Sequence, residues 1–246
     1  MSSIERTANL YRSLRLFAIS QGLTGILGQA EANELSYLQF AQQLAEHESA
    51  ERNRKRVERN RRLARFPVLK SLDEFDYRHQ STITKREVNA LLDFSFIDNR
   101  ANLIFIGPPG VGKTHLAIGI GQKAVDAGFK VLFNTAMELV ETLEMAELRG
   151  ELKKRLASLA KFDVLIIDEL GYLPMSNSAR FNLFQRVNSL YEYRSIILTT
   201  NKAFTAWGDY FHDDNVAVPV VDRIIHHSHI FMLGGDSYRL KHRQTT

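Results

Sequence analysis

A glycine-rich octapeptide constrains the fold more than any other feature of the chain. It reads Gly107-Pro108-Pro109-Gly110-Val111-Gly112-Lys113-Thr114, follows the apolar residues 102–106 and precedes the helical segment from His115 to Ile118. This is the order of a phosphate-binding loop, in which glycines let successive backbone N–H groups surround the phosphates and a helix N-terminus adds its positive dipole end. The segment therefore predicts nucleoside triphosphate binding by an α/β domain.

The loop also supplies side chains suited to a nucleotide and its metal ion. Lys113 brings a full positive charge to the outer phosphates, and the hydroxyl of Thr114 is suited to ligate Mg²⁺. The predicted cofactors are therefore ATP and Mg²⁺. The predicted nucleotide-binding residues are Gly107, Pro108, Pro109, Gly110, Val111, Gly112, Lys113, Thr114 and His115.

A second apolar segment, residues 162–167, ends in the carboxylates Asp168 and Glu169, roughly 55 residues after the loop. We expect Asp168 to hold the Mg²⁺ shell and Glu169 to act as the general base that orients the attacking water. An Asp-Glu pair is common at strand ends. After a phosphate-binding loop, on a buried strand, it favours hydrolysis over simple binding. It also argues against a small-molecule kinase, where a glutamate that activates water would waste ATP.

Three further polar residues are candidates for catalysis. Asn201 ends the apolar segment that starts at Ser195, where it is able to hydrogen-bond the attacking water, although an asparagine here also suits a turn or a helix cap. Arg223 and Arg239 lie on either side of the last apolar segment, and phosphoryl transfer often needs an arginine from outside the loop. The sequence leaves open whether each arginine acts in its own subunit or in a neighbour. The predicted catalytic residues are Lys113, Glu169, Asn201, Arg223 and Arg239.

Helices and strands alternate after residue 100, which predicts a mostly parallel five-stranded sheet with helices on both faces. The predicted strands are residues 103–106, 130–134, 164–167, 195–199 and 229–233. A long insertion, 137–161, is split by Gly150 into two helical pieces. Before the sheet, residues 4–19 and 35–65 are predicted helices separated by the glycine-bearing stretch 21–29. We expect two domains, a helical one at 1–66 and an ATPase domain at 67–246.

The excess of positive charge is confined to the N-terminal part. Residues 1–66 carry 11 Lys or Arg and 7 Asp or Glu, whereas residues 67–246 carry 21 of each. Between Arg52 and Arg65, eight basic residues stand beside a single acid, Glu58. This basic run suits a solvated helix end, but the mutual repulsion of its charges favours contact with a nucleic acid. The insertion adds three adjacent cations, for which a solvated face, a DNA contact and a subunit contact stay open. The candidate DNA-binding residues are Arg52, Arg54, Lys55, Arg56, Arg59, Arg61, Arg62, Arg65, Lys153, Lys154 and Arg155.

Composition limits the compartment in which the chain is expected. It has no cysteine, so neither disulfides nor thiolate metal sites are available. No apolar run is long enough to span a bilayer, and the N-terminus lacks a basic-then-apolar secretory pattern. A cytoplasmic protein without a membrane partner is expected.

The order of these motifs resembles the AAA+ ATPases, and more narrowly the IstB/DnaC family. The narrow resemblance lies in residues 167–174 (Ile-Asp-Glu-Leu-Gly-Tyr-Leu-Pro) and 236–239 (Asp-Ser-Tyr-Arg), and it extends over roughly residues 72 to 240. It implies that the loop is a Walker A motif and that Asp168-Glu169 is Walker B. It further implies that Asn201 is sensor 1, that Arg223 lies in the arginine-finger segment and that Arg239 is sensor 2. With 13 residues after Leu233, no C-terminal lid domain is expected.

The two sides of this family imply different functions. The IstB side implies an ATPase encoded beside a transposase, which binds duplex DNA as an ATP-assembled homo-oligomer and presents that target to the transposase. The DnaC side implies loading of the replicative helicase, with contact to single-stranded DNA. We favour the IstB side, because a basic helix suits phosphate contacts along a duplex. A nucleotide-switched adaptor that never touches DNA is a third hypothesis.

Overall fold

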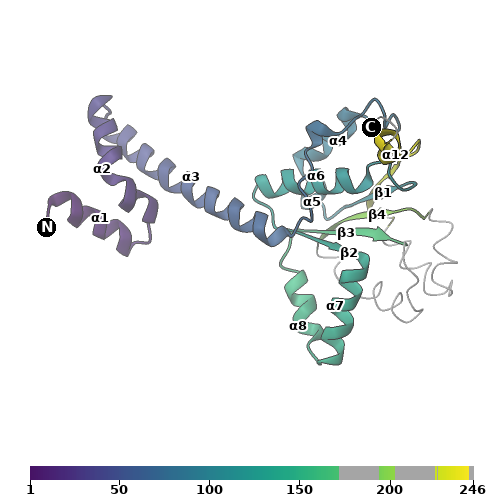
Figure 1. The fold of residues 1–246 in the computed structure, drawn as a ribbon. Coiled ribbons are helices and arrows are strands. Elements are labelled where there is room, and N and C mark those ends of the chain that lie inside the picture. The colour runs from purple at the N-terminus through teal and green to yellow at the C-terminus, as the bar shows by residue number, and fades with distance from the viewer. Residues whose placement is uncertain (172–193, 203–224, 226, 244–246) are drawn as a thin grey trace. The chain divides into compact units, whose positions relative to one another are not determined.

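The structure is a computed structural model, and it describes residues 1–171, 194–202, 225 and 227–243. The chain forms two compact units, Met1–Arg59 and Asn60–Thr246, which are treated separately below. Their elements are labelled in Figure 1. The boundary between the units lies within the residues of one helix, α3 (Tyr37–Ala64). No helix in the described part of the chain is both long and apolar enough to cross a bilayer.

The second unit is built on five parallel strands, as the sequence predicts. Their order in the sheet is β2-β3-β4-β1-β5, so β4 lies between β1, which precedes the glycine-rich loop, and β3, which ends in the two carboxylates. The strands are β1 (Asn102–Ile106), β2 (Val131–Thr135), β3 (Val164–Leu170), β4 (Ser195–Thr200) and β5 (Ser228–Met232). Because parallel strands end at the same edge, the polar residues that follow β1, β3 and β4 are brought together.

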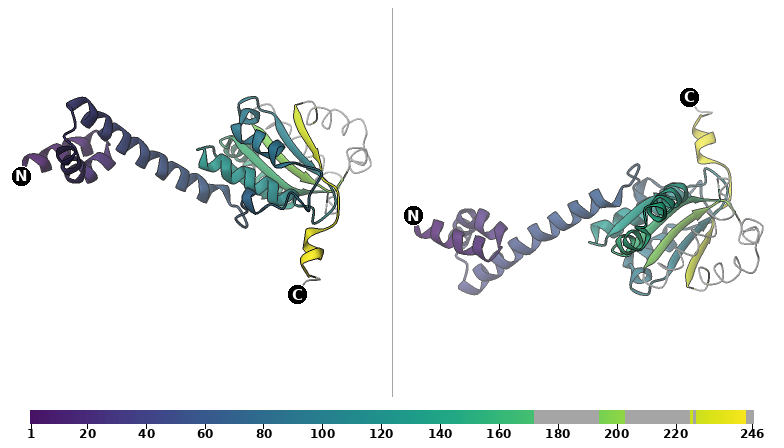
Figure 2. Two further views of the ribbon diagram at one scale, coloured as in Figure 1. Left: turned by 90° about the horizontal axis from the view of Figure 1, so that it is seen from above. Right: turned by 90° about the horizontal axis from the view of Figure 1, so that it is seen from below.

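Helices cover both faces of this sheet, which confirms the predicted fold class. In Figure 1, α6 lies on one face and the pair α7 and α8 on the other. Figure 2 shows the short α12 extending away from the sheet after β5. The helices of this unit are η1 (Leu72–Glu74), α4 (Lys85–Ala90), η2 (Leu91–Asp93), α5 (Ser95–Asp98), α6 (Lys113–Asp126), α7 (Ala136–Leu148), α8 (Leu152–Leu159) and α12 (Tyr238–Arg243).

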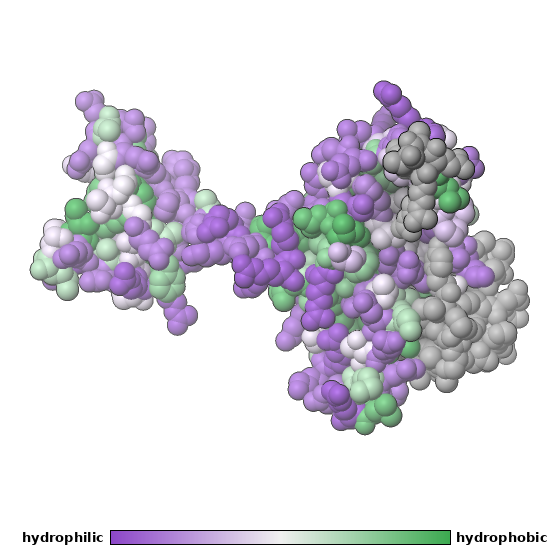
Figure 3. All heavy atoms as spheres, viewed as in Figure 1, coloured by the Kyte–Doolittle hydropathy of each residue, from purple (hydrophilic) through white to green (hydrophobic). Residues whose placement is uncertain are grey.

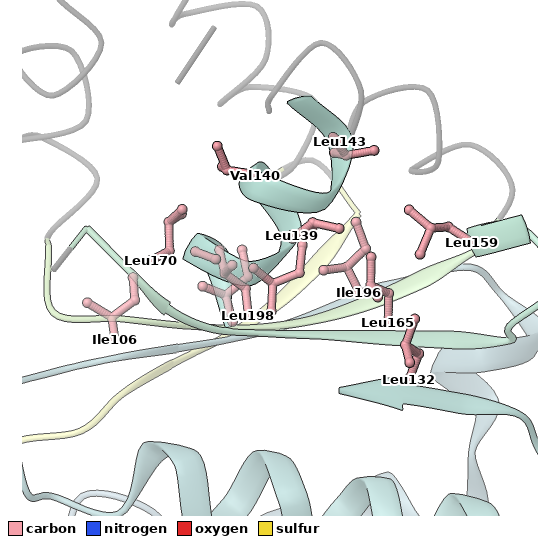
Figure 4. Close-up of a cluster of buried hydrophobic side chains, with 13 residues drawn as sticks. Ile106, Leu132, Leu139, Val140, Leu143, Leu159, Leu165, Leu170, Ile196 and Leu198 are labelled. Atoms are coloured by element: carbon pink, nitrogen blue, oxygen red, sulfur yellow. The ribbon is translucent and has the colours of Figure 1, made fainter. Parts of the chain in front are cut away.

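The insertion helices are held on the sheet by an apolar cluster (Figure 4). Leu139 and Leu143 of α7 and Leu159 of α8 are each at most 3 % exposed and pack over the strand residues Leu165 and Ile196. A fully buried leucine contributes about 1.5 to 3 kcal/mol by leaving water. The insertion is therefore an integral layer of the domain.

One strand is longer than the sequence predicts. β3 continues to Leu170, whereas the apolar pattern predicts its end at Ile167, before the carboxylates. A bulge makes the extension possible. Ile167 pairs with Leu198, and Leu170 pairs with Thr200, so two residues of β3 face one residue of β4. An apolar run marks where a strand is buried on both faces, but it does not reveal a bulge.

The prediction for the first N-terminal helices is wrong. Residues 4–19 do not form one helix, because α1 (Ser3–Ser13) ends and α2 (Phe17–Ala32) begins within them, and the glycine-bearing stretch 21–29 is helical. The break lies at Arg15, which has a left-handed φ of 60°. Gly22 lies inside α2, where a Cβ would come within 2.9 Å of the ring of His47. The glycine therefore allows close packing instead of ending a helix.

A buried carboxylate explains where α2 begins. Glu48 of α3 is 6 % exposed, and its Oε2 accepts hydrogen bonds from the Ala18 and Ile19 amides at 2.8 and 3.1 Å. These amides lie in the first turn of α2 and have no partner within the helix. Burial alone would raise the pKa of Glu48, but the Ile19 amide, Arg52 and the Ala18 amide together lower it. A contact between residues 30 apart in sequence thus sets the helix start.

Candidate nucleotide site

The glycine-rich loop and its lysine form one closed unit. The ammonium of Lys113 donates to the carbonyl oxygens of Gly107 and Pro108, at 2.8 and 2.7 Å. Lys113 is only 5 % exposed, at the first position of α6. A buried ammonium needs such partners, since an unpaired one is costly. The lysine is therefore held within the loop, where an incoming phosphate would meet it.

Two further carbonyls of the loop are bonded to residues outside it. The Gly110 carbonyl accepts from the Tyr238 amide at 3.1 Å, and the Val111 carbonyl accepts from Gln80 Nε2 at 3.1 Å. In a planar trans peptide the C=O and the following N–H point in opposite directions. These bonds therefore also fix the directions of the following N–H groups, those of Val111 and Gly112, and a phosphate cradle needs main-chain N–H groups held in place.

Close packing explains the glycines at two loop positions. Gly112 has a φ of 97°, and a Cβ there would lie 2.6 Å from the ring of Phe75. Gly110 has a φ of 85°, and a Cβ there would collide with the side chain of Ser237. Neither position accommodates a side chain without displacing an aromatic ring or the segment after β5.

Oxygen atoms from three elements converge at the carboxyl end of β3. Thr114 Oγ1 donates to Asp168 Oδ1 at 2.9 Å, and the hydroxyl of Thr199 on β4 donates to the same oxygen. Asp168 and Thr199 are 4 % and 1 % exposed. Carboxylate and hydroxyl oxygens are the ligands that Mg²⁺ prefers, and it commonly keeps several waters. The donor set of Thr114 and Asp168 therefore fits a magnesium ion.

Glu169 has a different environment from its neighbour. Its side chain is exposed and lines the same cavity as the loop, and its amide donates to Thr199 Oγ1 at 3.0 Å. Its φ of 61° is left-handed, which is uncommon for a residue with a Cβ. This turn of the main chain separates the two carboxylates, leaving Asp168 buried and Glu169 facing the cavity.

The loop opens on a cavity of about 440 Å³ that the sequence predicts only in part. Thr114, His115 and Glu169 line it, but so does the segment between Val68 and Gln80, which no motif marked. The ring of His115 bonds the Ser71 carbonyl at 2.7 Å, so this side chain is tied to the segment before β1. The cavity residues missed by the sequence are Val68, Lys70, Glu74, Phe75, Asp76, His79, Gln80, Ile118, Thr199 and Tyr238.

The segment after β5 is fastened to the loop. Gln80, which is 3 % exposed, donates to the Gly234 carbonyl at 2.9 Å as well as to the loop carbonyl of Val111. The ring of His79 packs edge-on against that of Tyr238, with centroids 5.3 Å apart. Arg239 follows Tyr238 in α12, so its main chain lies next to the loop.

Of the other two candidate catalytic residues, the structure describes Asn201 but not Arg223. Asn201 directly follows β4 and lies near Gly171, whose Cβ, if present, would be 3.3 Å from Asn201 Oδ1. This buried oxygen has no hydrogen-bond partner among the described residues. Arg223 lies outside the described residues, so its role stays a prediction.

Comparison with known proteins identifies the family. The model of the family described as IstB-like ATP binding protein matches residues 9–246. The chain belongs to this family. A relative from Geobacillus stearothermophilus, named for an ATP-binding protein of insertion sequence IS5376, is 39 % identical over 98 % of this chain and 96 % of its own length. A relative from Pseudomonas aeruginosa, named for an ATP-binding protein of insertion sequence IS21, is 40 % identical over 96 % of this chain and 89 % of its own.

Solved structures of similar fold agree with the AAA+ architecture. The DnaC helicase loader superposes with a TM-score of 0.50 and 23 % identity, over 66 % of this chain and 96 % of that one. AMPPCP-bound DnaA from Aquifex aeolicus gives a TM-score of 0.56 and 20 % identity, over 73 % of this chain and 54 % of that one. This family member is therefore an ATPase with an AAA+ core, and the predicted resemblance to IstB is confirmed.

In this IstB-like chain, several cations of the basic run in α3 are already paired with carboxylates, which the sequence did not suggest. Four of its cations lie within ion-pair distance of a carboxylate: Arg52 with Glu48, Arg54 and Lys55 with Glu51, and Arg61 with Asp126. Hydrogen bonding to Arg54 contributes most to lowering the pKa of Glu51 to about 2. In the described part of the chain, no carboxylate pairs with Arg56, Arg59 or Arg65. Along α3 the surface is nevertheless hydrophilic (Figure 3).

The insertion brings other predicted DNA-binding residues together. The predicted residues Arg65, Lys154 and Arg155 line a hollow of about 590 Å³ between α7, α8 and the end of α3, together with Glu141 and Glu151. Arg149, which the sequence did not single out, is a fourth basic residue of its lining. Lys154 lies 3.4 Å from Glu151. The buried Nε of Arg155 has no hydrogen-bond partner within the described ranges. Lys153 is exposed and does not line the hollow. We call this cavity, with its four basic residues, the insertion hollow.

Proposed function

We propose that this ATPase assembles on duplex target DNA and delivers that DNA to a partner transposase in insertion-sequence transposition. The observation that carries the proposal is its likeness to proteins named for insertion sequences, at 35 to 40 % identity over at least 95 % of this chain. The DNA part of the proposal is supported by three exposed cations that pair with no carboxylate of the described residues, Arg56, Arg59 and Arg65. The likeness to DnaC is one of fold, so a helicase loader is the alternative that the test must exclude.

Hydrolysis in this proposal uses the residues at the strand ends. The main-chain N–H groups of the loop and the ammonium of Lys113 bind the phosphates, and Thr114 and Asp168 would hold Mg²⁺. When bound, the metal ion supplies positive charge to the phosphate oxygens. Glu169 faces the cavity, where its carboxylate accepts a proton from the attacking water. Asn201, which directly follows β4, is proposed to orient that water.

Two arginines complete the proposed reaction centre. Arg239 lies in α12, whose first amide is bonded to the loop, and this placement supports contact with the triphosphate of its own subunit. Arg223 is proposed to reach the triphosphate of a neighbouring subunit in a homo-oligomer. Mixing Arg223→Ala chains with Lys113→Ala chains should then restore part of the ATPase activity, because some interfaces pair an intact loop with an intact arginine. If mixed assembly is verified and no ratio restores activity, Arg223 acts within its own subunit.

The insertion hollow is proposed as one of the DNA contacts. Its four basic side chains outnumber its two carboxylates, so the hollow favours a phosphate group. Contacts of this kind go to the backbone and are insensitive to sequence. We therefore expect binding to duplexes of different sequence with similar affinity.

The function is tested by comparing duplex and single-stranded DNA of equal length, with and without an ATP analogue that is not hydrolysed. Preferential, nucleotide-dependent duplex binding is expected, and Arg155→Ala with Lys154→Ala should weaken it about equally for every sequence. Exposed Lys153→Ala serves as the matched control. Preference for single strands supports the helicase-loader alternative, and absence of DNA binding supports the adaptor hypothesis. A transposase reading frame beside the gene would settle the choice of partner.

A further inference from the structure

The bulge at the end of β3 leaves a gap in the sheet that one side chain of β4 fills. Two residues, Asp168 and Glu169, lie between the paired positions on β3, whereas on β4 there is only Thr199. A bulge of this kind interrupts the ladder of backbone hydrogen bonds and redirects the side chains next to it. Bulges often lie beside active sites for this reason.

The hydroxyl of Thr199 replaces the missing ladder contacts. It accepts the Glu169 amide at 3.0 Å and donates its own proton to Asp168 Oδ1. A hydroxyl has one proton and two lone pairs, so it makes both bonds at once. Thr199 is 1 % exposed and lines the cavity in front of the loop. One buried oxygen therefore links the main chain of one carboxylate residue to the side chain of the other.

The conformation of Glu169 depends on such a restraint. Its φ of 61° is in the left-handed region, which a residue with a Cβ occupies only when its surroundings hold it there. The Thr199 hydroxyl accepts a hydrogen bond from the Glu169 amide. Thr199 lies on β4, the strand between β1 and β3. The direction in which the Glu169 side chain leaves the sheet therefore depends on this hydrogen bond.

We propose that Thr199 is a positioning residue for ATP hydrolysis, whose hydroxyl fixes the main chain of Glu169 and the carboxylate of Asp168. This inference rests on the roles proposed above for those two carboxylates. Threonine suits the task because its branched Cβ fills the buried site while its oxygen both donates and accepts. Valine has the same shape and makes neither bond.

The test compares Thr199→Val and Thr199→Ser in the full chain, measuring kcat, KM, affinity for a fluorescent ATP analogue and Tm. Because misplacing a reacting group by about 1 Å costs up to about 100-fold, Thr199→Val should lower kcat by about 10- to 100-fold while nucleotide affinity changes less than about threefold. Thr199→Ser keeps the hydroxyl and should restore most of kcat. Thr200→Val is the matched control, since Thr200 is equally buried but bonds the Leu170 carbonyl instead of a carboxylate residue.

A double-mutant cycle separates positioning from general stability. In a Glu169→Gln chain the base is already absent and only the contact of Thr199 with Asp168 is left to lose, so adding Thr199→Val should lower kcat by a smaller factor than in the unmodified chain. Full additivity, or an unchanged kcat in Thr199→Val, overturns the proposal. If Glu169→Gln itself hydrolyses ATP normally, the proposed role of Glu169 fails instead. Should Thr199→Val not fold, Thr199→Ala removes the hydroxyl without adding bulk and gives the same comparison.

Discussion

The nucleotide site and the basic run of α3 contain charged groups in two contrasting environments. Lys113 and Asp168 are nearly buried, and backbone carbonyls or threonine hydroxyls hold them in place. Arg54, by contrast, has a side chain that is 64 % exposed, and its main partner is a carboxylate three residues away on the same helix. Buried charged groups such as Lys113 and Asp168 are held in one geometry, whereas exposed ones such as Arg54 are able to exchange partners.

This contrast decides what a sequence motif is able to predict. The loop and the Asp-Glu pair have fixed positions at the ends of buried parallel strands, so their spacing implies their geometry. The function of a charge run depends on which charges are already paired. Exposed ion pairs contribute only about 0 to 1 kcal/mol, so a cation in such a pair is still able to leave its carboxylate and bind a DNA phosphate. The two regions should therefore respond very differently to substitution.

The largest effect, a loss of kcat, is expected on replacing the proposed general base, Glu169. Glu169→Gln should lower kcat by about 10²- to 10⁴-fold, the usual contribution of a positioned general base, and leave ATP affinity within a few-fold of the unmodified chain. Single-turnover hydrolysis and equilibrium binding of ATP measure the two quantities. Glu144→Gln, an exposed glutamate of α7, is the control and should change neither. Equal turnover in Glu169→Gln and the unmodified chain refutes the assignment.

The next largest effect is expected at the loop lysine. Lys113→Ala removes the ammonium that would bind the outer phosphates, and a charge-assisted hydrogen bond contributes about 1.5 to 3 kcal/mol. ATP affinity should fall by about 10- to 100-fold, as measured by titration of a fluorescent analogue. Lys123→Ala, in the last turn of the same helix, is the control. Unchanged affinity would mean that the loop binds phosphate through its main chain alone.

A buried carboxylate in the N-terminal unit should have a smaller effect, on stability. Glu48→Gln weakens the bonds to the first turn of α2 and should lower the free energy of unfolding by about 1 to 3 kcal/mol. The pKa of Glu48 is lowered in the folded chain, so its contribution is present above the ordinary carboxyl pKa and is lost as the pH falls through the folded value. Thermal unfolding at pH 7 and in acid measures both effects. The exposed Glu46→Gln should change stability by less than about 0.5 kcal/mol.

Much of the fold and of the nucleotide site is predictable from the sequence. Apolar runs mark strands buried on both faces, and all five predicted strands are present, with ends that shift by at most three residues. The role of Thr199 was missed because it depends on a bulge, and a bulge leaves no trace in hydropathy. The cavity wall between Val68 and Gln80 was missed because that segment has no regular pattern.

Tertiary contacts explain the remaining differences. The start of α2 is set by Glu48, about 30 residues away in sequence, so no local pattern marks the break near Arg15. The same applies to Arg61, whose partner Asp126 lies at the end of α6. Glu58 is the only acid between Arg52 and Arg65 in the sequence, but Glu48, Glu51 and Asp126 also pair with that basic run.

ATP-dependent binding of duplex DNA through unpaired cations is tested most directly by the salt dependence of that binding. Arg56→Ala, Arg59→Ala and Arg65→Ala together should flatten the slope of log affinity against log salt by up to about 2.7, because each phosphate contact adds about 0.9. The ion-paired set Arg54→Ala, Lys55→Ala and Arg61→Ala removes the same charge and should flatten it less. Equal flattening would mean that pairing does not matter. An unchanged slope in the first set would contradict DNA binding by this helix.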